Sequence, residues 1–136
     1  MTAQNSLSDN IKAQMRKGIL EYCILSILSR TDAYASEIIA ELRQSQMIVV
    51  EGTLYPLLTR QKNGGLLEYR WEESPQGPPR KYYRITEHGR HVLAQLDAAW
   101  NELVEQINNI RATDSLHQTL GDVDPWEDKT PLKTEY

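Results

Sequence analysis

Apolar side chains recur at helical spacing along the first part of this chain. The pattern predicts a helix that is capped by Ser6 or Ser8 and continues to about Arg30. One apolar stripe on it suits a domain core and consists of Leu20, Cys23, Ile24, Ile27 and Leu28. A second stripe consists of Ile11, Met15, Ile19 and Tyr22. Because a helix that is apolar on two faces is covered on two faces, we expect the domain to cover one and a partner subunit the other.

Two shorter helices are predicted next. The first opens at Tyr34–Glu37 and ends near Gln44, and the β-branched segment 47–50 then predicts a brief strand or an extended lead-in. The second begins at Glu51 and ends at the pair Gly64–Gly65, which supplies a left-handed stop. Its inward side comprises Leu54, Leu57, Leu58 and Gln61. Its outward, polar side comprises Thr53, Pro56, Arg60 and Asn63.

A period-two pattern follows the glycine pair. Leu67, Tyr69 and Trp71 alternate with charged residues, which predicts a half-buried strand that Tyr83 and Ile85 continue on its return. The connection SPQGPP is rich in turn formers and is expected to be exposed and mobile. A helix with a small polar face beside a hairpin with a basic tip is typical of the helix and wing of a winged-helix DNA-binding domain.

A last helix is predicted from Thr86, a capping residue, to about Arg111. Its apolar residues follow the 3, 4, 3, 4, 3 spacing of a heptad seam and are Leu93, Leu96, Trp100, Leu103, Ile107 and Ile110. So strict a seam favours pairing with a second long helix in a homodimer, although an ordinary amphipathic helix packed on its own domain is the plain alternative. The predicted fold class is therefore α+β, mainly α: a winged helix-turn-helix with a long C-terminal dimerisation helix.

Charge is unevenly distributed along the chain. The net charge is −4, and residues 113–136 account for all of it, with six acidic and two basic side chains. We expect residues 1–86 to form the DNA-binding domain, 87–112 the dimerisation helix and 113–136 a disordered acidic tail. Basic residues near the wing tip face little opposing charge, and local potential governs phosphate binding. The overall acidity is therefore a weak objection to a DNA-binding function.

The polar side of the predicted helix that begins at Glu51, and the wing, are predicted to contact DNA. Arg60 can fork onto guanine, Tyr55 suits a phosphate or a base methyl group, and Ser36 either donates to a phosphate or only caps its helix. The full predicted set is Ser36, Thr53, Tyr55, Pro56, Arg60, Gln76, Arg80 and Lys81. The plain alternative for all of them is an ordinary solvated surface.

Several stretches resemble the PadR family of bacterial transcriptional regulators: MRKGILEYCILSIL, YASEII, EGTLYPLLTR and GPPRKYYRITEHGR. The single long last helix resembles the short branch of the family, and Trp71 and Trp100 are placed as in its multidrug-binding regulators. Ala35 stands where glycine is common, and the acidic tail is outside the family pattern. The resemblance implies a homodimeric repressor that leaves a pseudo-palindromic double-stranded operator when a small ligand binds.

Trp100 is the sharpest candidate for ligand binding. If two long helices cross near a two-fold axis, the paired indoles can sandwich a small planar aromatic ligand. The residues that would line such a site are Met15, Ile19, Tyr22, Leu96, Asp97, Trp100 and Val104. Asp97 would favour cationic compounds. The alternative is that Trp100 only packs the interface.

Other chemistry is not expected from this sequence. The single cysteine, Cys23, is interpreted as inert core and favours a reducing, cytoplasmic location. His88 and His91 lack a third metal ligand, and no catalytic constellation, cofactor motif, signal peptide or membrane span is visible. Two rival interpretations stay open, namely a winged-helix protein-interaction module and a regulator without a small-molecule ligand.

Overall fold

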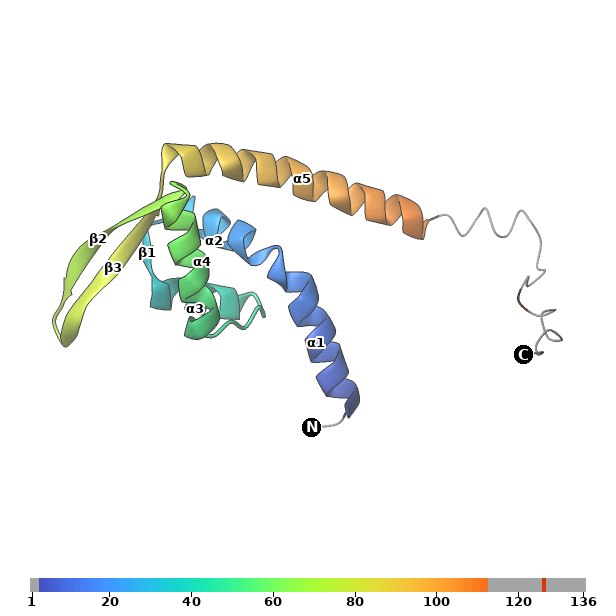
Figure 1. Cartoon of the computed structure of the whole chain (residues 1–136), viewed down its shortest axis with the longest axis horizontal. Helices are drawn as coiled ribbons and strands as arrows, with labels where there is room; N and C mark the ends of the chain where they lie inside the picture. The colour runs from blue at the N-terminus through green and yellow to red at the C-terminus, as the bar shows by residue number, and fades with distance from the viewer. Residues whose placement is uncertain (1–2, 113–125, 127–136) are drawn as a thin grey trace, which may run out of the picture. The chain divides into compact units, whose positions relative to one another are not determined.

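A computed structural model describes residues 3–112 and Trp126. Figure 1 shows the order of the helices and strands along the chain. Their bounds are α1 (Ala3–Lys17), α2 (Leu20–Leu28), β1 (Ala33–Tyr34), α3 (Ala35–Gln44), α4 (Glu51–Asn63), β2 (Leu67–Ser74), β3 (Gly77–Ile85) and α5 (Glu87–Arg111). The predicted acidic tail, residues 113–136, lies outside the described residues except for Trp126.

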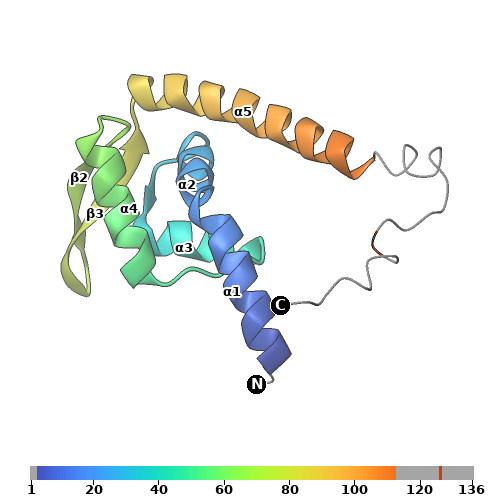
Figure 2. The same cartoon turned by 45° about the vertical axis from the view of Figure 1, so that its right-hand side comes forward.

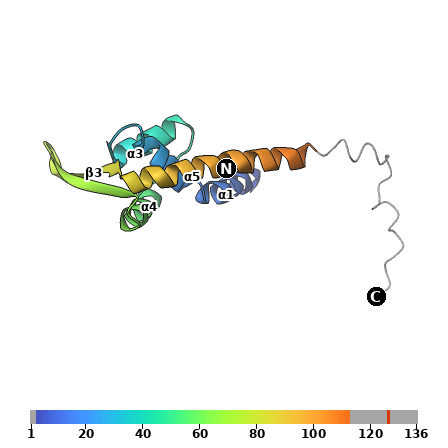
Figure 3. The same ribbon diagram turned by 90° about the horizontal axis from the view of Figure 1, so that it is seen from above.

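Helices α2, α3 and α4 and the sheet share one core. The largest fully buried apolar side chains come from all four of these elements and are Ile24, Leu25, Leu28, Ile38, Leu54, Leu58 and Leu67. The sheet is antiparallel with the order β1-β3-β2, and its β2–β3 hairpin projects away from the helices (Figure 3). This arrangement confirms the predicted α+β winged-helix fold with a long C-terminal helix.

The first predicted helix is wrong in two respects. It begins at Ala3, so Ser6 and Ser8 lie inside it and do not cap it, and the chain from Ser6 to Arg30 is not one continuous helix. It breaks at Gly18 and Ile19 into α1 and α2, as Figure 2 shows. Gly18 costs a helix interior about 1 kcal/mol relative to alanine, and a Cβ at this position would meet nothing within 4 Å, so no packing holds the helix straight here. The predicted second stripe therefore spans two helices, and on α1 its residue Met15 is 72% exposed.

Helix α4 has the predicted sides and the predicted end. Leu54, Leu58 and Gln61 are buried, whereas its polar side is exposed. Only Gly65 is left-handed, with φ of 79°, because Gly64 still has φ of −81°. The Leu66 N–H donates to the Gln61 carbonyl at 2.9 Å, which completes a Schellman motif. This end turns the chain directly into β2, so Figure 2 shows α4 beside the hairpin.

The hairpin is longer than predicted, since β2 and β3 extend into the segment expected to be a loop. Ser74 pairs with Gly77 across the tip, so only Pro75 and Gln76 form the connection. Leu67 is buried, but Trp71 further along the same face is 61% exposed, so the outer part of the hairpin stands clear of the core. Strand β1 was not expected, and segment 47–50 is the extended lead-in instead of a strand.

Helix α5 begins where the sequence predicted. The Gly89 N–H donates to the Thr86 hydroxyl oxygen at 2.9 Å, and that hydroxyl donates to the Gly65 carbonyl at 2.6 Å. One side chain thus caps α5 and ties it to the end of α4.

The chain divides into two compact units inside α5, the first ending at Asp97 and the second beginning at Ala98. The boundaries at 86 and 112 stay predictions. None of the described helices is both long enough and apolar enough to cross a membrane.

Candidate nucleic-acid interface

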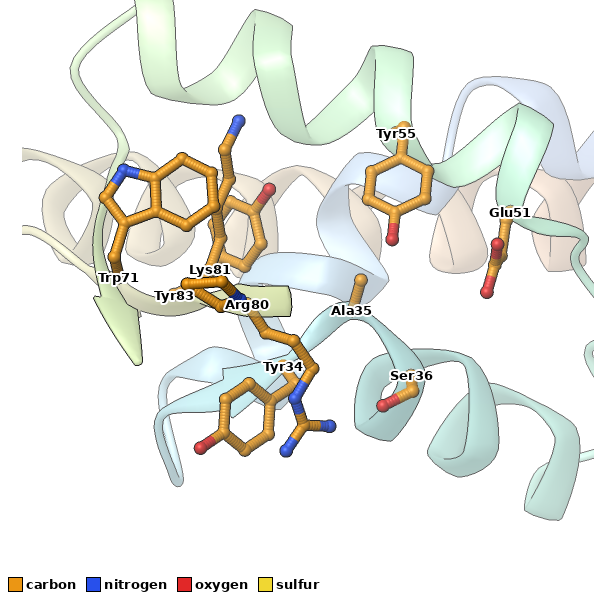
Figure 4. Close-up of a pocket in the computed structure, with 10 residues that line it drawn as sticks. Tyr34, Ala35, Ser36, Glu51, Tyr55, Trp71, Arg80, Lys81 and Tyr83 are labelled. Carbon is orange, nitrogen blue, oxygen red and sulfur yellow. The ribbon is translucent and has the colours of Figure 1, made fainter. Parts of the chain in front are cut away.

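A groove of about 400 Å³ lies between the start of α3, the start of α4 and the hairpin (Figure 4). It is lined by Tyr34, Ala35, Ser36, Glu51, Tyr55, Trp71, Pro79, Arg80, Lys81 and Tyr83. Four of these residues, Ser36, Tyr55, Arg80 and Lys81, belong to the predicted DNA-contacting set. The fold therefore brings together residues that are far apart in the sequence.

The two cations of the groove rest on aromatic rings. The Arg80 guanidinium carbon lies 3.8 Å from the centre of the Tyr34 ring. The Lys81 ammonium lies 4.5 Å from the Tyr69 ring and 5.5 Å from the Trp71 ring. Their charges oppose one acidic lining residue, Glu51, so the groove is suited to an anionic partner.

The start of α3 adds a second favourable feature for anions. Ser36 lies in the first turn and is exposed, whereas Tyr34 is the capping position and its N–H donates to the Glu37 carboxylate at 2.9 Å. Ser36 is therefore not the capping residue, and its hydroxyl points toward the groove from a helix end whose N–H groups favour negative charge (Figure 4).

The remaining predicted contacts, on α4 and at the hairpin tip, lie outside this groove. Thr53 lines a separate cavity of about 350 Å³ together with Arg16 and Lys17 of α1. Pro56 is exposed on the polar side of the helix. Gln76 is also exposed and forms part of the hairpin tip.

Arg60 is held by an ion pair with Glu21 of α2. The neighbouring Gln61 side chain is buried and donates from Nε2 to the Glu21 carbonyl at 3.0 Å, so the end of α4 is fastened to the start of α2. The Arg60 side chain is still 69% exposed, so the guanidinium donors outside this ion pair stay accessible.

The residues predicted to hold a small ligand belong to both compact units. Leu96 packs against the core, and the Tyr22 hydroxyl donates to the Asp97 carboxylate at 2.5 Å. That hydrogen bond, with some burial, raises the pKa of Tyr22 to about 12. Trp100 and Val104 belong to the second unit.

The predicted dimer seam is also divided. Leu93 and Leu96 pack against the core of the first unit, as the plain alternative expected. The later seam residues are exposed large apolar side chains, with exposed fractions of 42% for Trp100, 51% for Leu103, 52% for Ile107 and 71% for Ile110.

The remaining candidate residues are one cysteine and two histidines. Cys23 is half-buried against Met47, with its Sγ 3.8 Å from the Met47 Sδ, and burial raises the pKa of its thiol. His88 and His91 are exposed, and the described residues contain no cluster of three or more metal-ligating side chains. The interpretation of Cys23 as a packed, unreactive thiol agrees with this environment.

Sequence patterns did not single out Tyr34, Glu51 or Tyr83 as lining residues. Tyr83 was expected only as a strand residue, and no spacing rule predicts that a lone tyrosine before α3 will reach the hairpin. The missing signal is the pairing of β1 with β3, which places Tyr34 opposite Tyr82.

The sequence of this chain is similar to those of known proteins. Residues 24–95 match the model of the transcriptional regulator PadR-like family. An uncharacterized protein from Lysinibacillus sphaericus is 30% identical over 101 residues, which cover 72% of this chain and 93% of that protein.

Solved structures of transcriptional regulators are also similar to this chain. A PadR-like transcription factor from Bacteroides fragilis is 59% identical, with 74% of this chain and 98% of that chain covered and a TM-score of 0.65. A PadR family transcriptional regulator from Eggerthella lenta is 32% identical, with coverages of 82% and 97% and a TM-score of 0.75. The groove between α3, α4 and the hairpin thus belongs to a member of the PadR-like family of transcriptional regulators.

Proposed function

We propose that this protein is a cytoplasmic, homodimeric repressor that binds a pseudo-palindromic operator in double-stranded DNA. The observation that carries the proposal is the groove itself, where Arg80 and Lys81 face the start of α3 and the exposed Tyr55 of α4. Salt-dependent affinity for DNA comes mainly from cations that neutralise phosphates, and sequence is read by side chains at base edges.

In this proposal α4 lies in the major groove with its polar side toward the bases. Tyr55 contacts a phosphate or a thymine methyl group, and Thr53 and Pro56 lie alongside it. Arg60 contacts a guanine with the donors that the ion pair with Glu21 leaves free. The hairpin acts as the wing, with Gln76 at its tip and Arg80 and Lys81 on backbone phosphates or in the neighbouring minor groove.

The test is fluorescence anisotropy of labelled DNA taken from upstream of the protein's own gene. The protein is titrated at about 50 and 200 mM salt, with a scrambled duplex alongside. We expect tight, salt-sensitive binding to the upstream DNA and weaker binding to the scrambled duplex. Equal binding to both, or none, would contradict operator recognition and favour a protein-interaction module.

The exposed apolar face of α5 supports the homodimer. Leu103, Ile107 and Ile110 follow one another at heptad spacing and are each at least half exposed. A second copy of the same helix would cover them in a self-complementary contact. Two-fold symmetry would then place two wing grooves on two half-sites about one or two helical turns apart.

We further propose that a small planar aromatic ligand binds between the two Trp100 side chains and releases the DNA. Trp100 is 42% exposed, and Asp97 precedes it by one turn of α5 with a carboxylate that would favour a cationic ligand. Release requires that the ligand bind more tightly to a dimer arrangement in which the half-site spacing no longer fits.

Quenching of tryptophan fluorescence by proflavine, a planar aromatic cation, tests the ligand proposal in the absence of DNA. We expect quenching by the wild type and by Trp71→Phe, and its loss in Trp100→Ala. Operator binding should persist in Trp100→Ala. Quenching that survives in Trp100→Ala would place the ligand elsewhere, and wild-type protein without quenching would favour a regulator that has no such ligand.

A further inference from the structure

One face of the wing carries alternating acidic and basic side chains. They are Glu68, Arg70, Glu72, Arg80 and Arg84. The Arg70 Nε lies 2.6 Å from the Glu72 carboxylate, and the Arg84 Nε lies 2.6 Å from the Glu68 carboxylate. Arg80 is therefore the one arginine of the hairpin that has no carboxylate partner among the described residues.

Strand register alone would pair Arg80 with an acid. Its Cα partner across the hairpin is Glu72, and opposite charges facing each other across antiparallel strands attract. The Glu72 carboxylate is instead engaged by Arg70, and the Arg80 guanidinium lies over the Tyr34 ring at 3.8 Å. Arg80 thus keeps its positive charge unneutralised at the groove.

Three interactions fix the position of Tyr34. Its strand β1 pairs with β3, its ring lies 4.7 Å from the Tyr82 ring, and its N–H donates to the Glu37 carboxylate. A ring fixed in this way attracts the guanidinium charge without using its N–H donors, which stay available for a phosphate. In Figure 4 the Arg80 guanidinium nitrogens lie beside the Tyr34 ring.

We propose that Tyr34 is a positioning residue for DNA binding, whose ring holds the Arg80 guanidinium away from Glu72 and ready for a backbone phosphate. This inference rests on the proposed function. The partner is the phosphodiester backbone of double-stranded DNA, and Arg70 assists by occupying the competing carboxylate. An arginine ordered before binding loses less conformational freedom when it contacts phosphate.

A double-mutant cycle tests the proposal by anisotropy with the upstream duplex. The variants are Tyr34→Leu, Tyr34→Phe, Arg80→Ala and Tyr34→Leu with Arg80→Ala, each checked for an unchanged circular dichroism spectrum and Tm. We expect Tyr34→Leu to weaken binding about two- to fivefold, the range of an exposed cation–π contact, and to reduce the salt dependence. Tyr34→Phe keeps the ring and should bind as the wild type does.

The coupling between the two sites decides the outcome. We expect Tyr34→Leu to have no further effect once Arg80 is alanine, because the ring then has nothing to hold. Equal losses in both backgrounds, or a loss in Tyr34→Phe as large as in Tyr34→Leu, would overturn this inference alone. If Arg80→Ala itself leaves DNA binding unchanged, the wing contact of the proposed function is wrong, and this inference with it.

A second arm uses Glu72 as the competitor. Arg70→Ala frees the Glu72 carboxylate to pair with Arg80, so the proposal expects weaker binding. Glu72→Gln should then strengthen binding more in the Arg70→Ala background than in the wild type. An equal gain in both backgrounds would show that Arg70 does not shield Arg80, and would overturn its part in the proposal.

Discussion

At the residue scale, Gly89 decides how closely α5 approaches the end of α4. A Cβ at this position would lie 2.2 Å from the Leu66 carbonyl oxygen and 2.7 Å from a side-chain carbon of Ile85. The first contact is with backbone, which cannot rotate away. The glycine in the EHGR stretch is therefore required by packing.

Gly89→Ala should destabilise the protein by about 1–3 kcal/mol, because overpacking outweighs the helix propensity of alanine. Urea unfolding at fixed protein concentration measures the change. Gly52→Ala is the matched control, since nothing lies within 4 Å of a Cβ at that helical position. Equal effects of the two substitutions would contradict the steric argument.

The hydrogen bond between Tyr22 and Asp97 should give one tyrosine an unusually late titration. Its pKa is raised to about 12 from the ordinary tyrosine value of 10.0, chiefly by the hydrogen bond to Asp97. The fold thus favours the protonated hydroxyl, so its contribution to stability is fully present below pH 10 and is lost as the pH rises toward about 12. Because the pair is largely exposed, solvent screening keeps this contribution small.

Ultraviolet absorbance of tyrosinate measures this titration directly. We expect a step near pH 12 in the folded wild type that is absent in Tyr22→Phe. In Asp97→Ala the same step should move down toward the ordinary tyrosine pKa of 10.0. An unchanged curve in both variants would show that the hydrogen bond is not formed in solution.

At the scale of elements, two helices end in the same left-handed turn with different residues. Gly65 follows α4 with φ of 79°, and Gln46 follows α3 with φ of 67°. In each, the next N–H donates back to the last turn of its helix, from Leu66 to Gln61 at 2.9 Å and from Met47 to Leu42 at 2.8 Å. Glycine adopts this conformation without strain and glutamine does not.

Gln46→Gly should therefore stabilise the protein by roughly 0.5–1 kcal/mol, the strain relieved less the added entropy of the unfolded chain. Gly65→Ala should destabilise the protein by a similar amount, because alanine is strained at a φ of 79°. No steric clash adds to this cost, since its Cβ would meet only a His88 side-chain carbon at 3.9 Å. Thermal unfolding followed by circular dichroism compares the two. Destabilisation by Gln46→Gly would mean that its side chain makes an important contact.

Helix α4, the start of α5 and the hairpin could be predicted because each is indicated by residues that lie close together in the sequence. The spacing of Leu54, Leu58 and Gln61 predicted the buried side of α4, and Thr86 predicted the start of α5. Alternation along β2 predicted the hairpin, although proline and glycine near its tip suggested a longer loop than the two residues observed. Arg80 and Lys81 were expected at the site because they are basic residues near the end of that hairpin.

The features that sequence missed depend on partners distant in the chain. Strand β1 is two residues long and exists only because β3 pairs with it. Tyr34 lines the groove for the same reason. The break at Gly18 was hidden because apolar spacing continues across it, and the ion pair of Arg60 with Glu21 could not be foreseen because it joins separate helices.

At the scale of the whole molecule, the proposed function needs two copies. The exposed seam of α5 supplies a surface for this, and a new charge at its centre should prevent pairing. Ile107→Lys should shift the protein from dimer to monomer in sedimentation velocity and weaken operator binding tenfold or more, because burying an unpaired ammonium costs several kcal/mol. Asn108→Lys, an equally charged neighbour on the exposed helix, should remain dimeric. A dimeric Ile107→Lys would contradict the α5 interface.

The central claim is that the wing groove binds DNA phosphates, and the salt dependence of operator affinity tests it most directly. Each neutralised phosphate contributes about 0.9 to the slope of log affinity against log salt concentration. In Arg80→Ala with Lys81→Ala, we expect weaker binding to every duplex and a slope reduced by up to about 3–4 for a dimer with two wings. Lys12→Ala with Arg111→Ala, which removes two cations outside the groove, should leave the slope as it is. A wild-type slope in the Arg80 and Lys81 variant would contradict the account.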